Sequence, residues 1–481
     1  MLTMTASASS SRGRTIGRWT TAALVFGITT RSWMFLRDPP VWHDEAAMLV
    51  NVLEKGFAQL LGPLEYAEAA PPLFSWAERA MARFVGTGPF ALRLIPFLAS
   101  IAALLLVLPL TRQLRDSWTA LIAVGLAAAS SALTLFSVEA KPYAIDIFVA
   151  TALPCAYFAT AAWPLSRRLS LLSAAAPACI WLSYPGVFVV AAMLTAFALD
   201  CWTVRTTPAW TWWTTAAMVA GGAVLLLVIG PVRAQRTLDL ESNWIRGFPN
   251  YSAPGSIPAW AVRQTIGIVD YCFRPIGGIL LLPALVGVGA MWTRARATVV
   301  ITLGGPIVLA FGAALVHAYP YAGSRVMAFA LPGLAIFVAE GIGCVVHSIP
   351  PLRRAAVSAM LVAIVLAPPA VLAAHDVVRG WRRPDTAGAA AYVRRANGQG
   401  DRIASGHWEY RYYLHDIEPP TIDLTRQAMP RAPRVWLLVH GSTPAERQGF
   451  ARGLAAAQWR VDHTHEFDGV SVVLLRAVDG S

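Results

Sequence analysis

Two adjacent acidic residues, Asp44 and Glu45, follow the first long apolar segment and are preceded by His43. Tandem carboxylates are often no more than a solvated loop. Here Pro39-Pro40, Val41-Trp42 and a further apolar stretch flank the pair, and desolvation in such surroundings raises the pKa of a carboxyl group. A carboxylate so placed is suited to act as general base toward a hydroxyl, or to bind a metal ion.

A second charged group, Glu139 and Lys141, stands just before Tyr143 at the start of another apolar segment. The two charges could simply neutralise each other. The functional alternative is that Lys141 offers a cation to a phosphate, while Glu139 orients the lysine or helps to hold a metal ion.

A third candidate is Arg325, which ends the short polar segment that contains Tyr321 and leads into an apolar stretch. Its position conflicts with the positive-inside rule described below, which indicates either a bound anion or a side chain that snorkels to lipid headgroups. An aromatic and basic loop around Arg246 and Tyr251 could contact an isoprenoid chain or lie in the membrane interface.

The segment after Pro71-Pro72 predicts an interfacial helix that extends to about Val85. Such a helix would fold the first polar loop back along the membrane and wall a site near Asp44.

The composition indicates a polytopic membrane protein. Of 481 residues, 56% are hydrophobic and only 14% are charged, and the apolar runs have the length that crosses a bilayer. The formal charge of +12 does not indicate nucleic-acid binding, because no basic stretch is interleaved with aromatic residues. The five scattered cysteines predict neither a disulfide nor a metal cluster.

Hydropathy predicts about eleven membrane-spanning helices. The proposed spans are Thr20–Leu36, Phe90–Leu110, Trp118–Phe136, Tyr143–Ala162, Leu169–Ser183, Gly186–Leu199, Trp210–Gly230, Ile276–Trp292, Thr298–Val316, Val326–Val346 and Ala355–Ala374. The least certain region is residues 169–199, which is either two helices broken at Tyr184-Pro185-Gly186 or one re-entrant segment. Two helices place the arginines at span ends on one face, which the positive-inside rule makes cytoplasmic. These arginines are Arg12, Arg14, Arg18, Arg112, Arg115, Arg167, Arg168, Arg205, Arg294, Arg296, Arg353 and Arg354.

This topology predicts a multi-pass protein of the cell (inner) membrane with a cytoplasmic N-terminus. The membrane domain covers residues 1–374, and its acidic first outer loop is residues 37–89. Residues 375–481 have a soluble composition with strand-like runs at Arg402–Gly406, Arg434–His440 and Val470–Leu475, which predicts a small α/β domain outside the membrane.

The order of these motifs resembles the polytopic GT-C glycosyltransferases, in particular the bacterial branch of the protein mannosyltransferase and aminoarabinose transferase superfamily. The resemblance covers about residues 32–343 in patches. It is carried by Trp42-His43-Asp44-Glu45-Ala46, Pro71-Pro72-Leu73, Arg93-Leu94-Ile95-Pro96, Glu139-Ala140-Lys141-Pro142-Tyr143-Ala144 and Gly323-Ser324-Arg325 with Pro332.

The resemblance implies transfer of a sugar from a polyprenyl-phosphate donor to a hydroxyl of a lipid, glycan or protein, outside the cytoplasmic membrane. It makes Asp44 and Glu45 the catalytic candidates and places Glu139, Lys141, Tyr143 and Arg325 near the donor phosphate. His43, Glu68, Tyr321 and Arg246 become candidate substrate contacts, and a divalent metal ion on Asp44 and Glu139 is an open possibility. One departure is Ala70, where the family often has a charged residue or histidine before the Pro-Pro pair. Glu68 and Glu65 are the possible substitutes.

The competing class is a transporter or flippase of a lipid-linked sugar. Transporters usually place ionisable residues in the middle of broken helices, whereas here Asp146 and Glu340 are the main mid-span charges. The clustering of charge at the outer boundary favours the enzyme.

Overall fold

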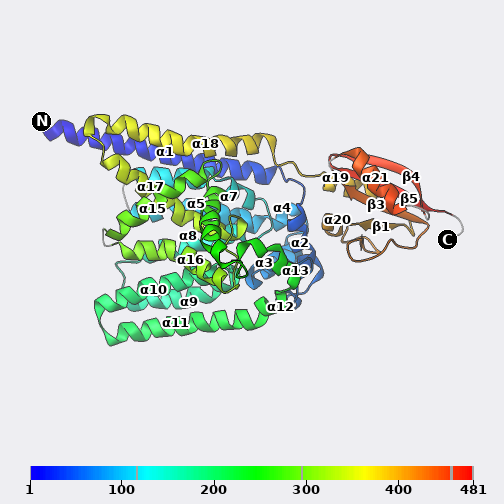
Figure 1. Ribbon diagram of the computed structural model, residues 1–481, viewed down its shortest axis with the longest axis horizontal. Coiled ribbons are helices and arrows are strands. Elements are labelled where there is room, and N and C mark those ends of the chain that lie inside the picture. Colours follow the sequence, from blue (N-terminus) through cyan, green and yellow to red (C-terminus); the bar gives the residue numbers. More distant parts are fainter. Residues whose placement is uncertain (1, 115–116, 294–295, 442, 456–458, 479–481) are drawn as a thin grey trace.

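The computed structural model describes the whole chain except residues 1, 115–116, 294–295, 442, 456–458 and 479–481. A long bundle of roughly parallel and antiparallel helices carries a small sheet domain at one end (Figure 1). The N-terminus lies at the opposite end of the bundle.

Each predicted span contains a helix. The bundle consists of α1 (Leu2–Leu36), α5 (Leu94–Leu114), α6 (Ser117–Ala129), α7 (Ser131–Phe136), α8 (Tyr143–Ala159), α9 (Leu165–Leu182), α10 (Gly186–Val204), α11 (Thr207–Leu227), α15 (Gly277–Thr293), α16 (Ala297–Leu315), α17 (Leu331–His347) and α18 (Pro351–Arg379). Residues 169–199 form two helices with the break at Ser183-Tyr184-Pro185, as one of the two alternatives had it.

The predicted third span is not continuous, which corrects the expectation of one helix over Trp118–Phe136. It breaks at Ser130, whose side chain accepts a hydrogen bond from the Leu133 N–H as the N-cap of α7 and donates one to the Cys272 carbonyl. A serine hydroxyl competes with the helix for backbone partners, which explains the break.

Six helical segments in the described part of the chain are long and apolar enough to cross a membrane, or seven if the bent pair α14 (Ile257–Cys272) and α15 forms one span. The helices α6 and α8 are apolar but shorter. The protein is therefore a multi-pass membrane protein, and the count of eleven spans stays a prediction.

Short elements cover the end of the bundle next to the sheet domain. In the first loop these are α2 (His43–Glu54), η1 (Gln59–Leu61), α3 (Pro72–Phe84) and α4 (Pro89–Leu92). The predicted helix after Pro71 is confirmed as α3, with Pro72 in its first turn, where the missing proline N–H has no cost. Phe74 and Glu78 of α3 are buried, whereas Phe84 is exposed.

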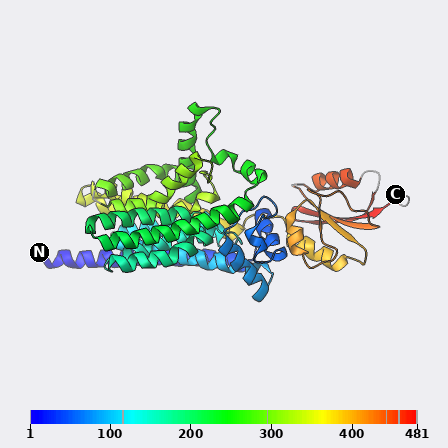
Figure 2. The same ribbon diagram turned by 90° about the horizontal axis from the view of Figure 1, so that it is seen from below.

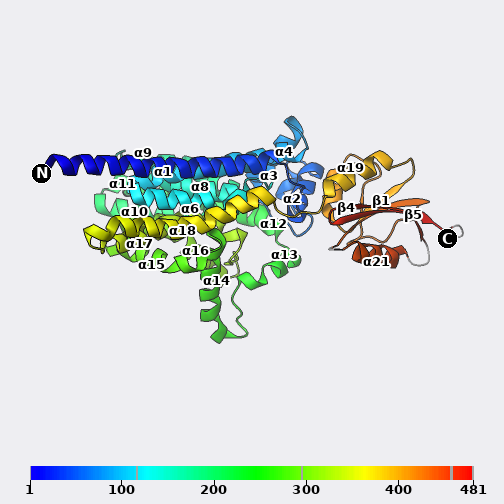
Figure 3. The ribbon, with the colours of Figure 1, turned by 90° about the horizontal axis from the view of Figure 1, so that it is seen from above.

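The region between α11 and α15, which includes the predicted aromatic and basic loop around Arg246 and Tyr251, is largely made of short helices. It contains η2 (Val228–Val232), α12 (Arg233–Gln235), α13 (Leu238–Asn243), η3 (Ile245–Gly247), η4 (Pro254–Ser256) and the sixteen-residue α14. The helix α14 meets α15 at 104° and projects sideways from the bundle (Figure 2, Figure 3). A further short helix, η5 (Arg325–Ala330), precedes α17.

The terminal domain is a five-stranded mixed sheet with the order β2-β1-β3-β5-β4. Its elements are α19 (Thr386–Ala396), β1 (Arg402–Ser405), α20 (Trp408–Tyr413), β2 (Ile422–Asp423), β3 (Arg434–His440), α21 (Pro444–Ala455), β4 (Trp459–Phe467) and β5 (Val470–Ala477). The strand β1 pairs in parallel with β2 and β3, and β5 pairs antiparallel with β3 and β4. All three predicted strands are present, as β1, β3 and β5.

The terminal domain is docked on α2 and the first loop through polar contacts. The Arg411 guanidinium donates to both oxygens of Glu54 at 2.6 and 2.5 Å, and Arg426 pairs with Glu65. The Tyr413 hydroxyl accepts a hydrogen bond from the Val41 N–H at 2.8 Å. The domain therefore rests on the same helix that carries Asp44.

We predict that the two ends of the bundle face opposite sides of the membrane. A reporter that is active only in the cytoplasm should be active when fused at Pro350 and inactive at the C-terminus, because the arginine-rich helix ends favour the cytoplasmic face. An exported phosphatase reporter should give the opposite pattern. A cytoplasmic C-terminus would overturn the eleven-span topology.

Candidate active site

The first loop is organised around a buried ion pair between Glu45 and Arg93. The Arg93 guanidinium donates from Nε to Glu45 Oε1 and from Nη2 to Oε2, both at 2.7 Å. Its Nη1 reaches Asp38 Oδ1 at 2.9 Å and the Pro39 carbonyl at 2.7 Å. The Ala140 N–H also donates to Glu45 at 2.9 Å. Glu45 is 0% and Arg93 1% exposed, so this pair lies in the interior and joins α2, the start of α5 and the 139–141 segment.

Burial alone would raise the pKa of Glu45, but the charge and hydrogen bonds of Arg93 outweigh it and hold that pKa below its usual range. Glu45 is therefore ionised and fully engaged. Glu139 belongs to the same network, since Arg383 donates to its Oε1 at 2.6 Å and to the Pro40 carbonyl at 2.9 Å. Arg383 comes from the segment between α18 and α19, so the terminal domain contributes a cation to this network.

Asp44 faces away from that interior and pairs with Arg325. Their side chains are 31% and 35% exposed, so a ligand can reach both groups. A second pair, Lys141 with Glu68, lies close enough for the charge of Lys141 to act on Asp44. Burial would raise the pKa of Asp44, but Lys141 and Arg325 together hold it below its usual range. Two cations and two carboxylates thus lie close together at the end of the bundle that carries the terminal domain.

Aromatic rings flank Arg325. Its guanidinium carbon lies 5.8 Å from the ring centre of Tyr143 and 5.5 Å from that of Trp244, a cation–π distance that orients the side chain. The backbone before it is held by close packing on α14. A Cβ on Gly323 would lie 2.7 Å from backbone atoms of Gly267, so only glycine fits there.

Ala70, which stands where GT-C relatives often have a charged residue or histidine, is held in the interior by its backbone. Ala70 is fully buried, its N–H donates to Gln235 Oε1 at 3.1 Å, and its carbonyl accepts from the Tyr184 hydroxyl at 2.9 Å. Of the two possible substitutes, Glu68 reaches the cluster through Lys141, whereas Glu65 pairs with Arg426 at the domain junction.

The other predicted substrate contacts lie in two separate places. His43, the residue before Asp44, has its Nδ1 3.0 Å from Glu409 Oε2 of the terminal domain. Tyr321, in the segment before η5, is buried against α14, and its hydroxyl lies 3.0 Å from Thr265 Oγ1 of that helix. The exposed Arg246 belongs to η3, and the neighbouring Gly247 carbonyl accepts the Tyr321 N–H at 2.9 Å. Tyr321 and Arg246 are thus grouped with each other, and as substrate contacts they stay predictions.

One group of possible metal ligands occurs in the described part of the chain, made of His43, His407 and Glu409. Asp44 and Glu139 do not belong to it, and each is paired with an arginine. A metal ion on Asp44 and Glu139 stays a prediction. The five cysteines are free thiols.

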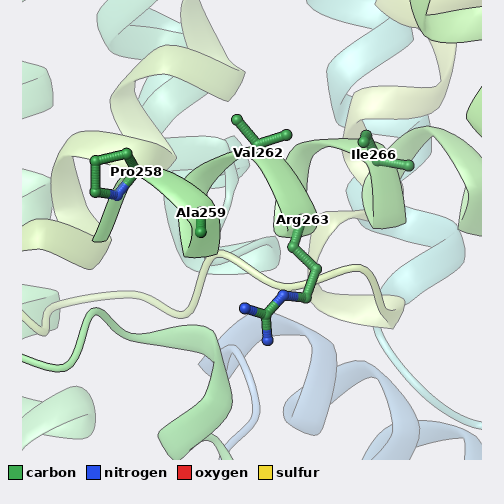
Figure 4. A pocket seen from close by; sticks show the side chains of 5 residues that line it. All are labelled: Pro258, Ala259, Val262, Arg263 and Ile266. Carbon is green, nitrogen blue, oxygen red and sulfur yellow. The ribbon is translucent and has the colours of Figure 1, made fainter. Parts of the chain in front are cut away.

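Two apolar hollows lie on the bundle surface, apart from the charged cluster. One, of about 510 Å³, is lined by Pro258, Ala259, Val262, Arg263 and Ile266 of α14 (Figure 4). The other, of about 520 Å³, runs between α9 and α11 and includes Leu73 of α3 and Trp181. Neither contains a predicted site residue.

A helical membrane bundle with a charged first loop and a small terminal α/β domain beside it defines a GT-C type fold. The crystal structure of ArnT, an aminoarabinose transferase from Cupriavidus metallidurans, matches in its apo state with a TM-score of 0.55 and 12% identity over 97% of this chain and 98% of that chain. Its structure bound to undecaprenyl phosphate gives 0.54 and 13% over 96% and 98%.

The oligosaccharyltransferase of Archaeoglobus fulgidus, in complex with Zn and sulfate, matches with a TM-score of 0.51 and 12% identity. That match covers 83% of this chain and 62% of the archaeal chain. No family model and no curated protein matches the sequence. The resemblance to GT-C glycosyltransferases is therefore confirmed at the level of the fold.

Sequence reasoning missed the cations that organise the site. The motif Arg93-Leu94-Ile95-Pro96 carries the resemblance but assigns Arg93 no role, although an arginine at that end of a predicted span is the same anomaly that identifies Arg325. Arg383 and Glu409 gave no comparable signal, because they come from the terminal domain and meet the first loop only in the folded chain.

We predict that Arg93→Ala destabilises the protein by about 3–5 kcal/mol, because it leaves the buried Glu45 carboxylate without its partner. Thermal unfolding of the detergent-purified protein measures the loss. The double variant Glu45→Met, Arg93→Met should lose much less, since it removes both charges. Equal losses of stability in the single and the double variant would contradict the view that the unpaired Glu45 charge causes the destabilisation.

We further predict that Glu78→Gln stabilises the protein above neutral pH. Both carboxyl oxygens of Glu78 are buried without a hydrogen-bond partner among the described residues, and burial raises its pKa well above the usual value. The folded wild type keeps this proton while the unfolded chain loses it, so wild-type stability falls as pH rises above about 5, by at most tenfold in the unfolding constant per pH unit. Between about pH 5 and 8, the loss of stability with rising pH should be smaller in Glu78→Gln than in the wild type and in the exposed-site control Glu418→Gln, by up to this factor per pH unit. Part of the slope remains in all three proteins, because burial also raises the pKa of Glu139, to about 7.

Proposed function

We propose that the protein is an integral membrane glycosyltransferase that moves a sugar from a polyprenyl-phosphate donor to a hydroxyl of a lipid, glycan or protein on the outer face of the membrane. The observation that carries this proposal is the cluster of Asp44, Arg325, Lys141 and Glu68 at the outer end of the bundle. It combines accessible cations for a phosphate with a carboxylate for an acceptor hydroxyl.

The structural neighbours support the donor class. One ArnT structure holds undecaprenyl phosphate, and the archaeal AglB structure, with a TM-score of 0.50 at 13% identity, holds an inhibitory peptide and a dolichol-phosphate. A donor phosphate of that kind needs positive groups at the membrane boundary. Arg325 and Lys141 supply two, and both are neutralised by carboxylates that an anionic ligand can displace.

In the proposed reaction the acceptor oxygen forms a bond to the anomeric carbon while the bond from that carbon to the phosphate oxygen breaks. The acceptor proton goes to Asp44, and the polyprenyl phosphate leaves with its charge stabilised by Arg325 and Lys141. A single displacement of this kind inverts the anomeric centre.

Donor binding prepares Asp44 for this role. In the resting site Arg325 and Lys141 lower the pKa of Asp44, which makes it a weak base. A phosphate on these cations offsets their charge, so the proton affinity of Asp44 rises when the donor is bound. We assign Glu45 and Glu139, which the sequence placed in the catalytic and phosphate-binding sets, to positioning, because both are engaged with arginines inside the protein.

We predict that Asp44→Asn lowers the rate of sugar transfer by about 10²–10⁴-fold, the usual contribution of a general base. Lys141→Ala and Arg325→Ala should weaken donor binding as well as the rate. The measurement is transfer or hydrolysis from a panel of radiolabelled polyprenyl-phosphate sugars by membranes that contain each variant.

Asp200→Asn is the matched control, because Asp200 also pairs with an arginine, Arg168, but on α9 and α10. It should keep wild-type activity. Undiminished turnover in Asp44→Asn would remove Asp44 from the mechanism. Movement of a lipid-linked sugar across proteoliposomes without turnover would instead establish the transporter alternative, for which the buried Asp146 and Glu340 would be the first residues to test.

A further inference from the structure

Three side chains with metal-ligating atoms meet where the terminal domain rests on α2. His43 is the first residue of α2, and His407 and Glu409 stand on either side of Trp408 at the start of α20. Each offers one ligand atom, and these atoms all lie within 4.8 Å of one another. His43 Nδ1 and Glu409 Oε2 are 3.0 Å apart. The cluster thus draws on two parts of the chain that are more than three hundred residues apart in sequence.

The surrounding rings hold these side chains in place. The Trp408 ring stacks on His43 with centroids 4.0 Å apart, and the His440 ring stacks on His407 at 3.6 Å. His440 is held in turn by the Tyr410 hydroxyl, 2.8 Å from its Nε2. The Glu409 side chain is 5% exposed and that of His43 35%, so the carboxylate is buried while the cluster stays open on one side. An ion and its water can therefore enter without unfolding of the junction.

The donor set selects the class of ion. Two imidazoles and one carboxylate suit Zn²⁺ and related first-row ions, whereas Mg²⁺ and Ca²⁺ prefer oxygen ligands throughout. Bonds of about 2.0–2.1 Å in a tetrahedron place ligand atoms roughly 3.4 Å apart, so small side-chain rotations bring the three atoms to that spacing. The fourth position is left for water or for an oxygen of a ligand.

We propose that His43, His407 and Glu409 bind a divalent first-row metal ion, Zn²⁺ by preference, which ties the terminal domain to α2 one residue before Asp44. This site is separate from the cluster of Asp44, Arg325, Lys141 and Glu68, and its occupancy does not require a donor or an acceptor. The ion adds a coordinate link to the polar contacts of Arg411 with Glu54 and of Tyr413 with Val41, and so fixes the first turn of α2.

Cobalt binding to the full-length protein tests this site. The protein is purified in detergent with a tag that contains no histidine, stripped with a chelator and titrated with Co²⁺. The wild type should bind one Co²⁺ per chain with the intense visible absorption of a four-coordinate site, and Zn²⁺ should displace it. His407→Ala and Glu409→Gln should bind at least about 100-fold more weakly, because each removes a ligand, and loss of a group that only hydrogen-bonds a ligand typically costs 10–100-fold. Zn²⁺ should raise the unfolding temperature of the wild type but of neither variant.

The matched control is His463→Ala, which removes an exposed histidine of β4 outside the cluster and should bind Co²⁺ as the wild type does. Glu409→Gln keeps the shape of the side chain, so it separates loss of a ligand from loss of folding. A wild type without the cobalt absorption, or ligand variants that bind as tightly as the wild type, would overturn the proposal. Because binding is measured without substrate, an occupied metal site in a protein that transfers no sugar would count against the proposed function alone.

Discussion

The bidentate ion pair between Glu45 and Arg93 is the interaction on which the end of the bundle beside the terminal domain depends. Transfer of both charges from water to the interior costs several kcal/mol per ion. That cost is offset because both groups make further hydrogen bonds. Arg93 also donates to Asp38 and to the Pro39 carbonyl, and Glu45 also accepts from the Ala140 N–H. The pair therefore fixes α2, the start of α5 and the 139–141 segment in one arrangement.

The burial of Glu45 determines what its neighbour can do. Adjacent residues on a helix point in directions about 100° apart, so once Glu45 points inward, Asp44 must point toward the outer surface and Arg325. The same Ala140 N–H that satisfies Glu45 sets the position of Lys141, the next residue. Two adjacent carboxylates that look equivalent in the sequence thus differ in the folded protein: Glu45 is buried and holds the loop, whereas Asp44 is partly exposed and accessible. The difference comes from their environments and not from the residue type.

Local patterns predicted much of the fold. Apolar length and arginine-rich ends located the bundle helices, with α6 and α7 predicted as one span, and alternating apolar residues located β1, β3 and β5. The edge strand β4 was missed because most of its residues are exposed and polar, and α14 was missed because its apolar residues lie within a stretch that begins with turn-forming Pro254-Gly255. For the site, Asp44, Lys141 and Arg325 were identifiable as charges at the outer ends of spans. The arginines that pair with the buried carboxylates were not, because Arg93 with Glu45 and Arg383 with Glu139 join residues whose proximity is created by the tertiary fold.

The terminal domain is part of the electrostatic framework of the site and more than a cover over it. Arg383, at its entry, balances Glu139 and lies 3.7 Å from Glu45, so it shares the compensation of two buried carboxylates with Arg93. Burial and the charge of Glu45 raise the pKa of Glu139 to about 7 even though Arg383 opposes the shift. Without the terminal domain Glu139 would therefore keep its proton and lose its ion pair. Elsewhere in the junction between the terminal domain and the first loop, Glu409 lies within hydrogen-bond distance of His43, the residue immediately before Asp44. The direction in which Asp44 points is thus set by Arg93 on the side of the bundle and by the terminal domain on the other side. The docking of the domain and the geometry of the site are therefore one structural property.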